Sequence, residues 1–125
     1  MKKIRILLAE DSAALRQSIK TLLALSQESD FSCEVCGEAA DGRAAINLAK
    51  ELRPDVILLD LSLPELSGFQ VASVLRTELP SATIVIMSQQ DPALLRHAAG
   101  TVNVQHYIPK SRLASDLLPL LSSLP

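Results

Sequence analysis

Acidic and other polar side chains follow several apolar runs in this sequence, and they are the residues best placed to do chemistry. This set is Glu10, Asp11, Asp60, Ser88 and Lys110. Adjacent carboxylates such as Glu10 and Asp11 repel each other, and a carboxylate that ends a buried strand needs a partner. A hard divalent cation such as Mg²⁺ would balance three carboxylates against one lysine. Its remaining water positions would suit a phosphoryl group.

These side chains can act together only if the surrounding elements bring them to one place. Aliphatic runs predict five strands, and helical spacing of apolar residues predicts five helices between and after them. The expected strands are 4–9, 34–39, 56–61, 82–88 and 104–108, and the expected helices are 13–25, 41–52, 67–79, 91–100 and 111–123. Regular alternation predicts an α/β fold, a flavodoxin-like (βα)5 doubly wound parallel sheet with strand order 2-1-3-4-5. In such sheets ligands bind outside the carboxyl ends of the first and third strands, where the carboxylates fall.

Composition sets the broad class. The 125 residues are 48% apolar and 21% charged, which is typical of one globular domain spanning 1–125. A net charge of -2 argues against a nucleic-acid or membrane surface. The apolar stretch near the N-terminus is too short for a signal peptide or a membrane span. We therefore expect a cytoplasmic protein without membrane association.

Two cysteines, Cys33 and Cys36, have the C-x-x-C spacing of redox motifs and half zinc sites. No second cysteine pair accompanies them, and His97 and His106 lie far along the chain. In a strand, positions three apart point to opposite faces. The interpretation as two ordinary small apolar residues is therefore favoured over a redox or metal site.

Each polar residue also has a structural explanation when it is taken alone. Asp11 could cap the following helix, Ser88 could be an ordinary hydroxyl at a strand end, and Lys110 could be a surface lysine. Asp60 is harder to explain in this way because it follows a run expected to be buried. The joint placement of these residues at one sheet edge carries the information.

That combination resembles a bacterial response-regulator receiver domain over essentially the whole chain. The matching features are the pair Glu10-Asp11, Asp60 within DVILLDLSLPELSG, Ser88 after IVIM, and Tyr107 three residues before Lys110. Pro64 and Gly68 stand four and eight residues after Asp60, as in the family. The segment from residue 40 to residue 71 looks most like receivers joined to helix-turn-helix domains that regulate transcription.

The resemblance implies that Asp60 accepts a phosphoryl group from a sensor histidine kinase or a phosphotransfer protein. It implies Mg²⁺, with Mn²⁺ able to substitute, held by Asp11, Asp60 and the backbone carbonyl of Ser62, and by Glu10 through water. Such a domain is a phosphoprotein switch with at most intrinsic phosphotransfer and autodephosphorylation, and not an enzyme in the wider sense.

The same resemblance implies a switch in which Lys110 and Ser88 bond the phosphoryl oxygens and Tyr107 turns inward. The change would alter the face formed by the fourth helix, the fifth strand and the fifth helix. Surplus leucines in the last helix, at 113–124, raise the possibility of a homodimer on activation. Contact with DNA would require an output domain that these 125 residues do not supply.

Departures from the family pattern keep other functions open. Gln89 stands where a small residue is usual and could hinder phosphodonor access, and His106 replaces a usual glycine. One alternative is an interaction module that never meets a kinase. Another is a Mg²⁺-dependent phosphatase, although Ser62 stands where such enzymes need a second acid. A flavin or dinucleotide site is weaker, since no G-x-G-x-x-G follows the first strand.

Overall fold

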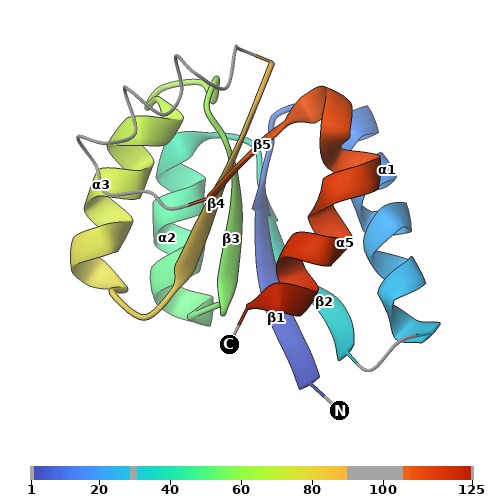
Figure 1. The fold of residues 1–125 in the computed structure, drawn as a ribbon. Helices are drawn as coiled ribbons and strands as arrows, with labels where there is room; N and C mark the ends of the chain where they lie inside the picture. Colours follow the sequence, from blue (N-terminus) through green and yellow to red (C-terminus); the bar gives the residue numbers. More distant parts are fainter. Residues whose placement is uncertain (1, 29–30, 90–105, 125) are drawn as a thin grey trace.

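One parallel five-stranded sheet forms the centre of the molecule in the computed structural model, which describes residues 2–28, 31–89 and 106–124 (Figure 1). The strand order is β2-β1-β3-β4-β5, so the predicted flavodoxin-like fold is confirmed. The strands are β1 (Lys2–Ala9), β2 (Phe31–Ala39), β3 (Val56–Asp60), β4 (Thr83–Ser88) and β5 (His106–Pro109). The helices are α1 (Ala13–Ala24), α2 (Gly42–Leu52), α3 (Gly68–Glu78) and α5 (Leu113–Ser123), with short 3-10 turns η1 (Leu25–Glu28) and η2 (Lys110–Arg112). The helix expected at 91–100 lies outside the described residues.

Helices cover both faces of the sheet, α1 and α5 on one face and α2 and α3 on the other (Figure 1). Successive residues of β1 alternate between these layers: Ile6 and Leu8 face α1 and α5, while Leu7 and Ala9 face α2 and α3. The alternation follows from the two-residue period of a strand. A strand buried on both faces needs apolar residues at every position, which explains the continuous aliphatic runs of β1, β3 and β4.

Strand β2 begins three residues earlier than the sequence predicted. Phe31 and Ser32, expected in a loop, pair with Lys2 and Lys3 of β1. β1 itself starts at Lys2 instead of residue 4, so its partner strand is extended in step. The start of β2 is therefore set by its pairing with β1 and not by the polarity of the local sequence.

Side-chain caps start helices α1, α2 and α3. Ser12 accepts a hydrogen bond from the Leu15 amide, and Asp41 accepts one from the Ala44 amide. Ser67 caps α3 with a full capping box. These caps satisfy orphan amides of the first helical turn and fix where each loop ends, so they help to position the edge at which the polar residues gather.

Helix α5 continues through Pro119 to Ser123, so the shortening that a proline could have caused is not seen. Of the six leucines in α5 and its C-cap, three are buried and three are half-buried against the same core. In order they are Leu113, Leu117 and Leu121, then Leu118, Leu120 and Leu124. The large apolar side chains that are exposed in the described residues are Leu25 and Val74, on other elements. The apolar surplus of the last helix is thus mostly core, and a homodimer through it stays a prediction. No described helix is long and apolar enough to cross a membrane.

Candidate functional site

Three carboxylates meet at the carboxyl edge of the sheet, where β1 and β3 end side by side. Glu10 and Asp11 follow β1, Asp60 is the last residue of β3, and their oxygen atoms lie within 4.8 Å of one another. Glu10 and Asp60 are each only 1% exposed, whereas Asp11 is exposed. The parallel pairing of β1 with β3 produces this meeting, because it aligns the two strand ends. The predicted convergence of these three acids is confirmed.

Lys110 brings the positive charge to this cluster from the end of β5. Its Nζ lies 2.9 Å from Glu10 Oε1 and 3.3 Å from Asp60 Oδ1. The side chain of Lys110 is 16% exposed, so both ion pairs are largely shielded from solvent. Lys110 is closer to Glu10 than to Asp60.

Burial alone shifts the pKa values of Glu10 and Lys110 in opposite directions, because it disfavours the charged form of each group. Burial raises the pKa of Glu10 above its ordinary value; the Ser12 amide and Lys110 offset part of this, and the charge of Asp60 adds to it. Burial alone would lower the pKa of Lys110, but Glu10 and Asp60 outweigh that effect and raise it. Lys110 is therefore held firmly as a cation. For Glu10, the net effect of burial and its neighbours is a raised pKa.

The Asp60 carboxylate is oriented by a backbone amide two residues further along the chain. The Ser62 amide donates a 3.0 Å hydrogen bond to Oδ1, the same oxygen that Lys110 approaches. Helix α3 begins directly against this turn, where the Gly68 amide donates to the Leu61 carbonyl at 2.9 Å. A Cβ atom at Gly68 would lie 2.8 Å from the Asp60 carbonyl oxygen. Gly68 is thus needed for close approach of two backbones.

The donor set fits a hard divalent cation. All the ligand atoms are carboxylate oxygens, and among the described residues this is the group that could hold a metal. Glu10 Oε1 is buried and lies 2.9 Å from the Lys110 ammonium, so the one cation that the chain supplies here is already shared between Glu10 and Asp60. The cluster could therefore bind a metal ion, because the single positive charge of Lys110 does not neutralise three carboxylates.

Ser88 and Tyr107 lie on neighbouring strands beside the acids. Ser88 ends β4 and is 2% exposed, and it pairs in register with Pro109, next to Lys110. Tyr107 pairs with Ile86, two residues before Ser88, and its half-buried ring packs against the core on the α2 and α3 side. Ser88 lies at the end of its strand and Tyr107 lies within β5, and the roles of both residues in a switch stay predictions.

Comparison with known proteins agrees with this geometry. The family model described as the response regulator receiver domain matches residues 6–121. The chain belongs to this family. A receiver domain is the part of a two-component response regulator that receives the signal, and the Asp60 cluster lies inside the matched range.

Two curated relatives and one solved structure illustrate the match. The receiver is 38% identical over 98 residues to the probable transcriptional regulatory protein NarL of Mycobacterium tuberculosis, which covers 78% of this chain and 44% of that protein. It is 39% identical over 85 residues to a protein-glutamate methylesterase/protein-glutamine glutaminase of Pyrococcus abyssi, covering 68% of this chain and 22% of that protein. The signal receiver domain of the putative response regulator NarL from Mycobacterium tuberculosis superposes with a TM-score of 0.82 at 29% identity, covering 99% of this chain and 100% of that one. The chain thus spans less than half the length of these curated relatives, which are longer than one receiver.

Sequence reasoning missed two charged residues that touch the site from outside. Arg16 of α1 donates from Nη1 to the Glu10 carbonyl at 2.6 Å and from Nε to Glu38 Oε1 at 3.1 Å. Glu38 lies near the end of β2. Helical spacing places Arg16 on the same side of α1 as the buried Ile19 and Leu23, but it does not identify Glu10 or Glu38 as its partners.

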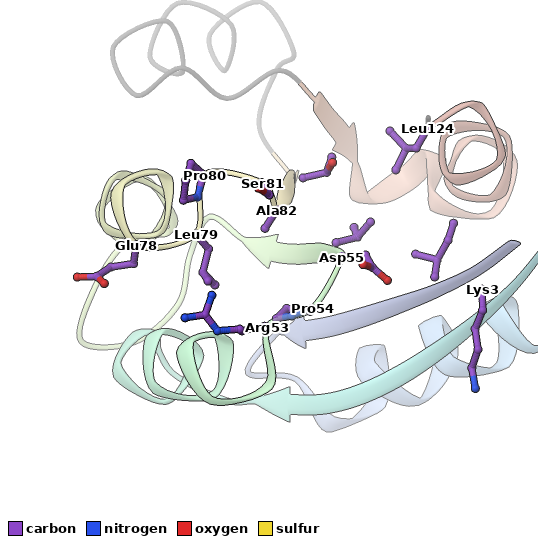
Figure 2. Close-up of a pocket in the computed structure, with 13 residues that line it drawn as sticks. Lys3, Arg53, Pro54, Asp55, Glu78, Leu79, Pro80, Ser81, Ala82 and Leu124 are labelled. Atoms are coloured by element: carbon purple, nitrogen blue, oxygen red, sulfur yellow. The ribbon is translucent and has the colours of Figure 1, made fainter.

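The other motifs of the receiver lie away from the acids. Cys33 is buried, Cys36 is half-buried, and both are free thiols. A cavity of about 490 Å³ opens at the opposite edge of the sheet, near the amino ends of β1, β3 and β4 (Figure 2). Lys3, Arg53 and Asp55 line part of it, and it contains none of the candidate site residues. This cavity and the acidic cluster are therefore separate features.

Proposed function

We propose that this receiver domain is a phosphoacceptor switch in which Asp60 takes a phosphoryl group from the phosphohistidine of a sensor kinase or phosphotransfer protein. The observation that carries the proposal is the buried Asp60 carboxylate, held beside two further carboxylates and a shielded lysine. Perturbed and crowded carboxylates of this kind cluster at functional sites. Membership in the receiver family supports the same conclusion.

The contacts of Asp60 indicate which of its oxygens reacts. Oδ1 accepts from the Ser62 amide and faces Lys110, so both contacts orient the carboxylate through one atom. We expect the other oxygen, Oδ2, to attack phosphorus. A new P–O bond then forms as the P–N bond to the kinase imidazole breaks, and the imidazole leaves with a proton. The product is an acyl phosphate on Asp60.

A divalent cation, Mg²⁺ or Mn²⁺, would supply charge neutralisation at the phosphoryl oxygens when it is bound. Asp11, Asp60 and the Ser62 carbonyl are the residues we expect to hold it, with Glu10 acting through water. Lys110 would then shift part of its contact from the carboxylates to a phosphoryl oxygen. Lys110 would thus pair first with the carboxylates and then also with the phosphoryl group.

The switch that follows would use Ser88 and Tyr107. A hydroxyl at the end of β4 can donate to a phosphoryl oxygen, and the half-buried ring of Tyr107 lies on the neighbouring strand β5. Movement of one would change the space left to the other, which is how a local charge biases a two-state element. The output would be read at the surface of β5 and α5, either by a partner or by a DNA-binding domain in the longer protein.

Phosphorylation by acetyl phosphate with Mg²⁺ tests the proposal, with intact-protein mass as the readout. Wild type should gain one phosphoryl group, and Asp60→Asn should gain none. Asp41→Asn is the matched control, because asparagine caps a helix about as well as aspartate and Asp41 lies outside the cluster. A wild-type chain that binds a metal but is never phosphorylated would support an interaction module instead. Phosphate on Asp60→Asn would place the acceptor elsewhere.

A further inference from the structure

Arg16 links three elements next to the acidic pair. It is the fourth residue of α1, and its guanidinium reaches the Glu10 carbonyl at 2.6 Å and the Glu38 carboxylate at 3.1 Å. The Glu10 carbonyl belongs to the peptide group that joins Glu10 to Asp11. Arg16 therefore connects the end of β2 to the one peptide from which two of the three site carboxylates extend.

The position of Arg16 is electrostatically unfavourable for helix α1. A cation in the first turn of a helix opposes the helix dipole, and α1 carries no acidic residue in that turn to offset it. Neutralising Glu38 does not require Arg16 either, since Lys20 Nζ contacts Glu38 Oε2 at 3.0 Å. The contact that Lys20 does not make is the one to Glu10.

The chemistry of arginine suits this contact. A guanidinium is a planar fork with several donors at fixed angles, so anchoring Nε on Glu38 fixes where Nη1 points. The Arg16 side chain is only 20% exposed, which limits its other rotamers. A lysine at this position would keep the charge, but its three donors lie on one nitrogen atom and are not held in a planar fork that spans two acceptors.

We propose that Arg16 is a positioning residue for the metal and phosphoryl site. By holding the Glu10–Asp11 peptide it fixes the directions of both carboxylates, with Glu38 as its anchor. This inference rests on the proposed function. It goes beyond it by assigning a role to two residues, Arg16 and Glu38, that contact no reacting group.

Charge and positioning predict opposite results for the same substitution. If Arg16 acted only through its charge, Arg16→Met would remove a cation beside three carboxylates and Mg²⁺ would bind more tightly. If Arg16 positions the peptide, Arg16→Met should bind Mg²⁺ about tenfold more weakly, the lower range for outer-shell partners of a metal site. Arg16→Lys should be almost as weak, because it keeps the charge and loses the fork.

Calorimetric titration with Mg²⁺ alone, with thermal unfolding in chelator alongside, decides between them. Lys20→Met is the matched control, since it removes the other cation on Glu38 without touching Glu10. We expect wild type and Lys20→Met to bind alike, and Arg16→Lys, Arg16→Met and Glu38→Gln to bind more weakly. If Arg16→Met does not fold, Arg16→Lys and Glu38→Gln give the answer.

Two failures can be told apart. Wild-type protein that binds no Mg²⁺ would overturn the proposed function and this inference with it. Wild-type protein that binds Mg²⁺, with Arg16 variants that melt earlier but bind equally well or better, would overturn this inference alone and leave Arg16 as a fold-stabilising residue.

Discussion

Replacing Gly68 with alanine should disturb the acceptor strand from outside the site. The added methyl carbon would lie 2.7 Å from Leu61 Cα and 2.8 Å from the Asp60 carbonyl oxygen. Both are backbone atoms, so no rotamer change relieves the contact, and α3 must move away from β3. Overpacking of this kind costs about 1–3 kcal/mol, while alanine gains up to about 1 kcal/mol over glycine in a helix. With both effects taken at the middle of their ranges, the net loss should be about 1.5 kcal/mol, or a fall in melting temperature of about 6 °C.

Urea and thermal unfolding measure the stability, and the rate of Asp60 phosphorylation by acetyl phosphate measures the site. The rate should also fall, because the turn that carries Asp60 and Ser62 must shift. Gly37→Ala is the control: its methyl would meet Leu52 Cδ1 at 2.7 Å and Leu7 Cδ1 at 3.3 Å, which are side-chain ends that can rotate. A Gly68→Ala protein as stable and as reactive as wild type would refute the reasoning. So would a larger loss in Gly37→Ala.

Two further predictions concern buried charge and buried thiols. Lys110→Met should lower stability in chelator by about 3 kcal/mol, since two buried carboxylates lose their shared cation. Saturating Mg²⁺ should restore more of this variant's melting temperature than of the wild type's, and equal restoration would count against a metal at the cluster. Burial raises the pKa of the Cys33 and Cys36 thiols, so both should be alkylated slowly at mildly alkaline pH, Cys33 the more slowly, as mass spectrometry can follow. Because the folded thiols keep protons that unfolded thiols release, stability should decline as pH rises above 9.0, their ordinary pKa, and a flat profile there would contradict the shift.

The fold could be predicted because its signals are strong and local. The strand β3, VILLD, is buried at every position, and caps such as Asp41 mark a helix start in the sequence itself. The acids of the site were found for a related reason. In a parallel sheet the carboxyl ends of strands share one edge, so polar residues that end apolar runs must meet.

Details that depend on a partner element could not be predicted. The start of β2 at Phe31 depends on the register with β1, and so does the extra residue Cys36, where pairing passes from Val35 to Gly37. Lys110 approaches Glu10 more closely than Asp60, a difference that depends on the tertiary placement of its side chain. The fork of Arg16 spans three elements, and no sequence spacing encodes such a contact.

The two edges of the sheet are both poor templates for another strand. β2 carries an extra residue at Cys36 that breaks its pairing rhythm, and the exposed charges of Glu34 and Glu38 flank that irregularity. At the other edge β5 is only four residues long and ends in Pro109, which has no amide hydrogen to offer. Short, charged, irregular or proline-bearing edges resist the addition of a foreign strand. Two copies of this protein should therefore not pair edge to edge through their sheets, even at high concentration. Any assembly that phosphorylation brings about would have to form through helices and loops.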